Sequence, residues 1–189
     1  MKKKGLPAYS VFGMLAGVWA CLILLAACEN PSQQYSNNEP PVETGGRSDE
    51  KQIVHLYFMD KENSYLIAEN RLIVKQRDPV ALGSHIVQGL LAGPQKALEP
   101  TIPQNTTLKA FYLTAKGIAF VDFSDTLKTH HVGGAKGELL TIYSIVNSLI
   151  LNVDEIEAVK ILINGRESST LAGHIDLRSP LKANMLLIR

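Results

Sequence analysis

The distribution of hydrophobic and polar residues divides the chain into three parts. An apolar run over about 11–25 follows three lysines, a polar stretch covers 29–51, and apolar residues then recur regularly as far as Arg189. The polar stretch has too few sizeable apolar side chains to build a core, so we expect it to be disordered. We therefore expect a leader at residues 1–27, a tether at 28–51 and one folded domain at 52–189.

Within the domain, the spacing of apolar residues predicts two hairpins, each followed by a helix. Strand-forming residues flank a polar turn in each hairpin. Asp78 before Pro79 predicts the start of the first helix, whose apolar positions then recur every four residues until Gly93-Pro94. The expected elements are strands at 53–59 and 65–75, a helix at 79–92, strands at 107–114 and 118–123, a helix at 137–151, and a strand at 159–163.

This order predicts an α+β fold. Asn164-Gly165 is a turn signal after the last strand, and 185–188 is a candidate edge strand. The order is therefore ββαββαβ, with one further strand optional. Two helices that each bury one face pack most simply on one side of a sheet. We expect a two-layer sandwich, with both helices on one face of a mixed, mostly antiparallel sheet.

The amino-terminal segment resembles a bacterial lipoprotein signal peptide. Its apolar run ends in Leu25-Ala26-Ala27-Cys28, an aliphatic residue and two small residues before a cysteine. We expect Cys28 to carry the covalent lipid and to hold the protein on the extracytoplasmic face of a cell membrane. An uncleaved signal anchor is the alternative. Cys21 would be removed with the leader, so the mature chain would have no free thiol, and we expect no other cofactor.

The charge balance argues against nucleic acid as a partner. The chain has 19 Lys and Arg against 18 Asp and Glu. Without the three lysines of the leader, 16 basic residues remain against 18 acidic ones, too few for binding driven by bulk positive charge. Arg71, Lys75 and Arg77 could form only a small basic patch.

Several segments of the domain, in their order and spacing, resemble the GerMN domain family of sporulation and spore germination. The resemblance implies a compact α/β module that is often lipid-anchored and is similar to the ring-building modules of sporulation secretion complexes. It implies no established catalytic residues. The matching segments are 56–58, 90–94, 102–108, 117–124, 138–149, 159–165 and 173–176.

The histidines do not predict a metal site. His130 and His131 are adjacent and have no Cys or H-x-x-x-H partner, so a solvated pair in a loop is the simpler interpretation. His85, on the first helix, and His55, in the first strand, are each expected to be partly buried and hydrogen-bonded.

Four other polar residues are candidates for chemistry or contact. Asp122 and Ser124 lie at the end of a strand, where a hydrolase could place them, but no nucleophile-elbow glycines surround Ser124. Both are expected to bind backbone groups there. Glu138 lies in the first turn of the long helix, and Asn147 is polar in an apolar stretch. We expect structural roles for these two, with a ligand or partner contact as the alternative. The glycine-rich segment 133–137 lacks the spacing of a Walker loop.

The sequence as a whole predicts a membrane-anchored envelope lipoprotein with a non-catalytic assembly or binding module. We expect its partner to be an envelope protein or another copy of itself. The alternative from another class is a peptidoglycan-binding helper in cell-wall remodelling, or more remotely a hydrolase.

Overall fold

The computed structural model of this chain describes residues 50–189. The expected leader at 1–27, the lipidation site Cys28 and nearly all of the expected tether lie outside the described residues. Strand β1 begins at Lys51, one residue before the expected start of the domain at 52.

The strands form two separate sheets. The smaller one is an antiparallel hairpin of β1 (Lys51–Met59) and β2 (Leu66–Val74), whose register runs unbroken from Lys51↔Val74 to Met59↔Leu66. The larger sheet has the strand order β3-β4-β5-β6, in which β4 and β5 are parallel and the other neighbours are antiparallel. Its strands are β3 (Leu108–Leu113), β4 (Ile118–Phe123), β5 (Ala158–Ile163) and β6 (Arg166–Glu167).

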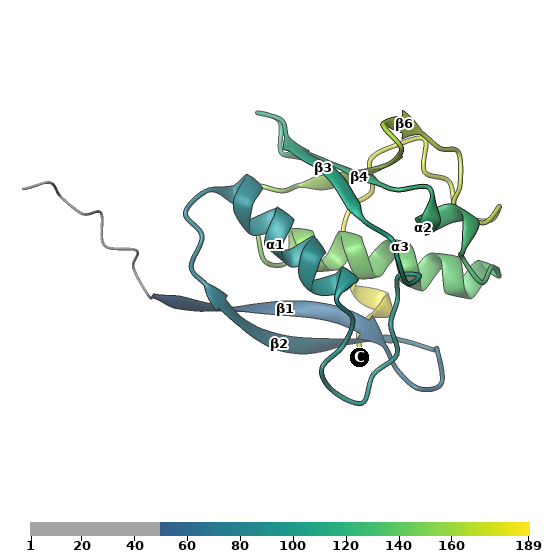
Figure 1. Cartoon of the computed structure of the whole chain (residues 1–189), viewed down its shortest axis with the longest axis horizontal. Helices are drawn as coiled ribbons and strands as arrows, with labels where there is room; N and C mark the ends of the chain where they lie inside the picture. Colours follow the sequence, from purple (N-terminus) through teal and green to yellow (C-terminus); the bar gives the residue numbers. More distant parts are fainter. Residues whose placement is uncertain (1–49) are drawn as a thin grey trace, which may run out of the picture. The chain divides into compact units, whose positions relative to one another are not determined.

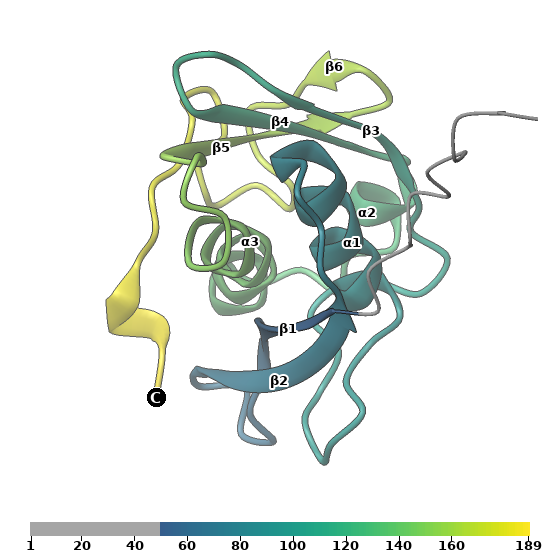
Figure 2. The ribbon, with the colours of Figure 1, turned by 90° about the vertical axis from the view of Figure 1, so that its left-hand side faces the viewer.

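Two helices lie between the two sheets (Figures 1 and 2). They are α1 (Pro79–Leu91) and α3 (Ala135–Ile150). As expected, α1 begins at the cap residue Asp78, whose carboxylate accepts hydrogen bonds from the backbone N–H groups of Val80 and Ala81. A short helix α2 (Thr126–Thr129), which was not expected, precedes α3, and a 3₁₀ turn η1 (Met185–Leu187) lies near the carboxyl terminus.

The α+β class, the mixed sheet and the order of the first five strands and two long helices are confirmed. The layering differs from the expected single sheet with both helices on one face. The physical reason is that α1 and α3 are each buried on more than one side. In α3, ten of the sixteen residues are buried, so one sheet cannot cover it. The parallel pairing of β4 with β5 uses the segment containing α3 as its crossover.

Two glycines show how tightly α1 is held. A Cβ atom added at Gly83 would lie 2.3 Å from Cζ of Phe111 in β3, and one at Gly89 would lie 2.7 Å from Cδ1 of Leu56 in β1. The helix therefore touches one sheet at Gly83 and the other at Gly89. At either position, a side chain larger than that of glycine would fit only if the neighbouring side chain moved.

The carboxyl-terminal segment differs from the expected edge strand at 185–188. These residues form the 3₁₀ turn η1, and a single parallel bridge joins Ile188 to Leu66 of β2. The backbone N–H of Arg189 donates to the carbonyl of Leu66 at 3.0 Å. No helix within residues 50–189 combines the length and the hydropathy that crossing a membrane requires.

Candidate functional site

Helix α3 presents a row of polar side chains to the outer edge of β1. The backbone N–H and C=O of His55 bond to the amide of Asn152, just past the helix, each at 2.8 Å. The N–H of Tyr57 donates to Ser148 Oγ at 3.0 Å, and Ser144 Oγ donates to the carbonyl of Tyr57 at 2.6 Å. These side chains take the place of a neighbouring strand, so this edge of the hairpin is closed.

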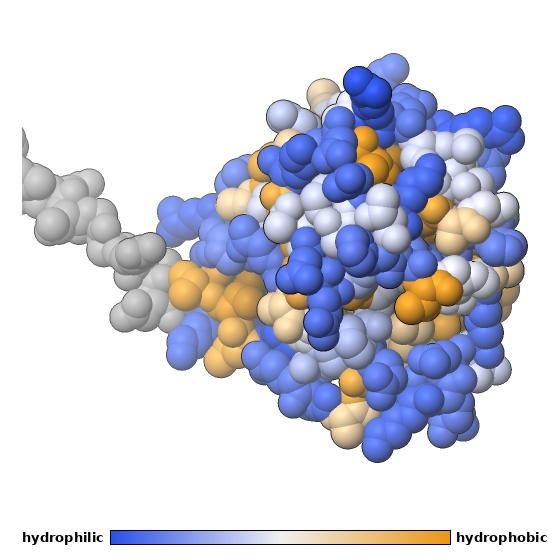
Figure 3. All heavy atoms as spheres, turned by 45° about the vertical axis from the view of Figure 1, so that its right-hand side comes forward, coloured by the Kyte–Doolittle hydropathy of each residue, from blue (hydrophilic) through white to orange (hydrophobic). Residues whose placement is uncertain are grey.

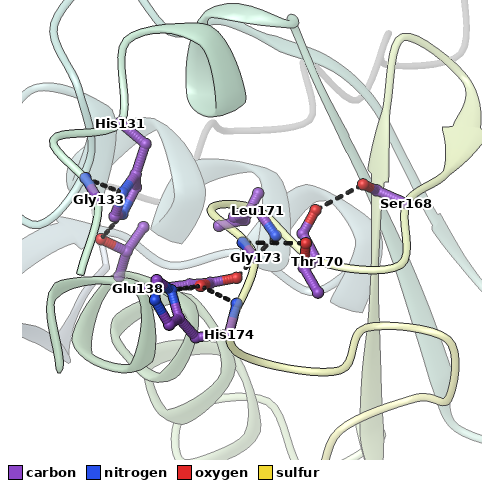
Figure 4. Close-up of polar contacts among 9 residues, drawn as sticks. His131, Gly133, Glu138, Ser168, Thr170, Leu171, Gly173 and His174 are labelled. Carbon is purple, nitrogen blue, oxygen red and sulfur yellow. Dashed lines mark hydrogen bonds and ion pairs between the residues drawn. The ribbon is translucent and has the colours of Figure 1, made fainter. Parts of the chain in front are cut away.

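Glu138, on the first turn of α3, holds the loop that follows β6 (Figure 4). Its carboxylate is fully buried and accepts the backbone N–H groups of Leu171 and His174, each at 2.8 Å, and His174 Nδ1 lies 3.1 Å away. Burial alone would raise the pKa of Glu138, but backbone N–H groups of the loop and the His174 ring outweigh it and hold the pKa below its ordinary value. The ionised carboxylate therefore holds the loop in place against α3.

Asn147 performs a similar task for the carboxyl-terminal tail. It is fully buried, and its amide donates to the carbonyl of Asn184 at 3.0 Å and accepts the Asn184 N–H at 2.9 Å. Neither Glu138 nor Asn147 has surface that a partner could touch in this conformation, and both make the structural contacts expected of them.

Asp122 and Ser124 bind backbone groups at the end of β4, as the sequence indicates. Asp122 Oδ1 accepts the N–H of Gly165 at 2.7 Å, and Ser124 Oγ accepts the N–H of Thr107 at 3.0 Å. These bonds hold the turn after β5 and the start of β3. No hydrogen bond within residues 50–189 joins Ser124 to a histidine.

His130 and His131 have different surroundings. His131 Nδ1 accepts the N–H of Gly133 at 3.0 Å, so its Nε2 carries the proton and donates to Thr141 Oγ1 at 3.0 Å (Figure 4). Burial lowers the pKa of His131, against the opposing effect of the Glu138 charge, and this favours the neutral ring. His130 is exposed and contacts Thr129 instead.

A pocket of about 200 Å³ lies beside these histidines, against the loop over 100–104. Its wall is mostly apolar, and the polar His131 and Thr141 are already bonded to each other. Thr141 Oγ1 also donates to the carbonyl of Thr101 at 2.6 Å. Nowhere in residues 50–189 do three or more His, Cys, Asp or Glu side chains gather in a way that could hold a metal ion.

The other two histidines correct the sequence-based expectation in part. His55 and His85 are hydrogen-bonded, to Asn70 Oδ1 and to the carbonyl of Ala81, each at 2.8 Å. Both are exposed rather than partly buried. His55 lies on the outer face of its strand, and His85 lies on the side of α1 away from its buried row, so the apolar neighbours in sequence do not cover either ring.

The small basic patch expected from Arg71, Lys75 and Arg77 is partly neutralised. Arg71 forms an ion pair with the buried Glu69 and donates to the carbonyl of Gly93 at 2.7 Å. Lys75 pairs with Glu50 at 2.7 Å. Two of the three cations therefore have acceptors within the domain.

Sequence reasoning missed two sets of structural polar residues. Ser144, Ser148 and Asn152 are spaced four residues apart, which places them in one line along a helix and was a readable signal. Lys160 alternates with apolar residues in the strand expected at 159–163, a pattern that does not show what surrounds it. It is 3% exposed and its ammonium donates to Glu167 and to the carbonyls of Leu177 and Arg178.

Comparison with known proteins agrees with this fold. The family model Germane, described as sporulation and spore germination, matches residues 55–169. The chain belongs to the Germane family. The resemblance to GerMN domains expected from the sequence is thereby confirmed. A search of curated proteins finds no match.

Three solved structures share the Germane fold. A candidate lipoprotein from Clostridium perfringens is 23% identical, with a TM-score of 0.51, over 71% of this chain and 87% of that one. The first GerMN domain of the sporulation protein GerM from Bacillus subtilis is 22% identical, with a TM-score of 0.57, over 69% of this chain and 97% of that one. The tandem GerMN domains of the same protein are 21% identical, with a TM-score of 0.58, over 70% and 46%. At these identities the likeness shows the fold.

Proposed function

We propose that this protein is an envelope lipoprotein, held by a lipid on Cys28 at the extracytoplasmic face of the membrane. Its Germane domain would act as a non-catalytic module for assembly or binding, in a process related to sporulation or germination. The proposal includes no cofactor besides the lipid and no nucleic-acid partner. The partner would be an envelope protein or another copy of the chain.

The observation that carries the non-catalytic role is the use of the polar side chains. Glu138, Asn147, Asp122 and Ser124 each bind backbone groups of another segment. Every buried side-chain nitrogen and oxygen within residues 50–189 has a hydrogen-bond partner. A catalytic group would instead need a free donor or acceptor aimed at a substrate. The geometry supports a scaffold that presents its surface.

The sequence Leu25-Ala26-Ala27-Cys28 supports the lipid anchor. It lies outside the described residues, and the candidate-lipoprotein description of the Clostridium perfringens relative agrees with it. The first test is to produce the full chain in a bacterial host and to determine the mass of its amino-terminal peptide from the membrane fraction. We expect a peptide that begins at lipid-modified Cys28, and a Cys28→Ala variant without lipid. An intact Met1 terminus on the wild-type chain would refute the anchor.

The second test addresses the cell wall. Purified sacculi are incubated with the full chain, and bound protein and released muropeptides are measured. We expect neither retention nor release. Saturable retention would favour a peptidoglycan-binding helper over an assembly module, and release of muropeptides would contradict the non-catalytic role.

A further inference from the structure

The two edges of the small sheet differ in how their backbone groups are satisfied. The outer edge of β1 is closed by Ser144, Ser148 and Asn152 of the α3 segment. Because His55 bonds away from β2, its cross-strand neighbour Asn70 must also point its N–H and C=O away from β1. The same alternation applies to every second residue of β2.

The outer edge of β2 is satisfied only at its two ends. The carbonyl of Leu66 accepts the Arg189 N–H at 3.0 Å, and that of Val74 accepts the Gln76 side-chain amide at 2.8 Å. Between them, the outward N–H and C=O groups of Ala68, Asn70 and Leu72 make no hydrogen bond to any residue in 50–189. Figures 1 and 2 show β2 as an outermost strand.

This edge also lacks two of the features that prevent strand pairing, and its two charged residues, Glu69 and Arg71, form an ion pair with each other. Its nine residues contain no proline, and its register with β1 has no bulge. The β2 side chains on the exposed face of the hairpin are all uncharged. One of them, Leu72, is 62% exposed and lies beside Ile53 of β1, which is 59% exposed. Figure 3 shows hydrophobic atoms gathered at this end of the hairpin, beside the point where the chain enters the domain.

The edge strand of the larger sheet provides a contrast. Strand β3 has a register irregularity between Leu108 and Ala110 and an exposed Lys109 between them. A bulge and an edge lysine are two of the devices that discourage edge-to-edge pairing. The open edge of β2 has neither, so strand addition is expected there.

We propose that β2 pairs antiparallel with β2 of a second copy, about a two-fold axis that passes through Asn70. The sequence of the strand is self-complementary about that residue. Glu69 of one copy faces Arg71 of the other, so like charges do not meet, and Ile67 faces Ile73. The hairpins of two copies then form one four-stranded sheet, with a closed two-fold interface.

The proposed pairing satisfies the open groups of the edge. Ala68 of one copy lies opposite Leu72 of the other, and Asn70 lies opposite Asn70. Each directly opposed pair of this kind exchanges two backbone hydrogen bonds, or about six in total. A single strand pair buries little area, so we expect weak association in solution and stronger association when lipid anchors hold both copies in one membrane. This inference deepens the proposed assembly role and rests on it.

Single cysteines in the full chain test the pairing and its register. Opposed residues of this kind lie about 5.5 Å apart at their Cα atoms, within disulfide range. Asn70→Cys is expected to give a covalent dimer on mild oxidation of membranes. His55→Cys is the matched control, on the same exposed face but in β1, where the two copies are about 14 Å apart at three strand spacings. The wild-type chain controls for its own cysteines.

The register has a sharper test. Ala68→Cys and Leu72→Cys chains produced together are expected to crosslink to each other at least fivefold more than either does alone. Two results would overturn the proposal. One is equal dimer yield from Asn70→Cys and His55→Cys. The other is that Ala68→Cys crosslinks as strongly alone as it does in the mixture with Leu72→Cys.

Sedimentation of the purified full chain in detergent provides a second measurement. Leu72→Lys is expected to raise the dimer dissociation constant at least tenfold, whereas Leu186→Lys, at an 88% exposed leucine of η1, leaves it unchanged. Equal effects of the two variants would contradict edge pairing. These crosslinking and sedimentation results can be obtained whether or not the chain is lipidated. A monomeric chain that still binds an envelope protein would refute the pairing and leave the proposed function standing.

Discussion

Replacing Glu138 with Gln tests whether α3 holds the domain together through a buried charge. The substitution keeps the size and shape of the side chain and removes only its charge and one acceptor. In the wild type, two backbone N–H groups of the loop over 171–174 approach the carboxylate at 2.8 Å. In Glu138→Gln, one of these N–H groups meets an amide NH₂ group, so two donors face each other.

The size of the effect follows from these contacts. A hydrogen bond to a charged group contributes about 1.5–3 kcal/mol to stability. In Glu138→Gln, one of the two N–H bonds is lost, and the other is made to a neutral acceptor instead of a charged one. Removing the charge also relieves the cost of burying it, but the lowered pKa shows that the site favours the carboxylate over its neutral form despite burial. We expect a loss of about 2–3 kcal/mol in the free energy of unfolding, or about 6–12 °C in Tm for a domain of this size.

Urea unfolding at pH 7 measures this difference, with the exposed Glu155→Gln as the matched control, expected within about 0.5 kcal/mol of wild type. Because the pKa of Glu138 is lowered in the folded state, its contribution is complete above the ordinary value of 4.5. It is lost as the pH falls through the folded value, so the gap between wild type and Glu138→Gln narrows there. A Glu138→Gln variant as stable as Glu155→Gln at pH 7 would refute this reasoning.

Three further predictions concern packing, the tail and pH. Gly83→Ala is expected to destabilise the fold by about 1–3 kcal/mol, since its Cβ would overlap the Phe111 ring, whereas Gly137→Ala, with no neighbour nearer than 3.9 Å, gains up to about 1 kcal/mol from helix propensity. Thermal unfolding compares the two variants, and a change in Tm of the same sign in both would contradict the close packing at Gly83. Asn147→Leu leaves both backbone groups of Asn184 unpaired and is expected to speed amide exchange over 184–189 at least tenfold, while unchanged exchange would mean that the tail is held elsewhere. His131 is a base whose pKa is lowered in the folded state, so its contribution to stability falls as the pH drops below 6.5. His131→Gln is expected to flatten the dependence of Tm on pH between about 7.5 and 5.5, and an unchanged slope would contradict a neutral, partly buried ring.

The sequence predicted the local elements well because their signals are local. Asp78-Pro79 caps α1 as expected, and Asn164-Gly165 forms the turn after β5, both residues with positive φ. The layering was not predictable in the same way. Whether a helix is covered on one side or two depends on partners distant in sequence, and a wide apolar face alone does not show what covers it.

The candidate site shows a similar division. Glu138 stood out as a carboxylate in the first turn of the long helix, and Asn147 as a polar residue in an apolar stretch. Both are bonded to other segments. Their partners, the loop at 171–174 and the tail at Asn184, could not be found from the sequence, because those segments have no periodic pattern that places them. The burial of Lys160 could not be found either, because strand alternation does not reveal that backbone carbonyls cover that face.

In-cell crosslinking of the full-length protein, followed by identification of what it captures, tests the central claim most directly. We expect recovery of a defined envelope protein, of a second copy of the chain, or of both. The yield should be lower from Cys28→Ala, which cannot be held in the membrane by lipid. A wild-type chain that is captured with neither, and that yields the same background as Cys28→Ala, would contradict an anchored assembly module.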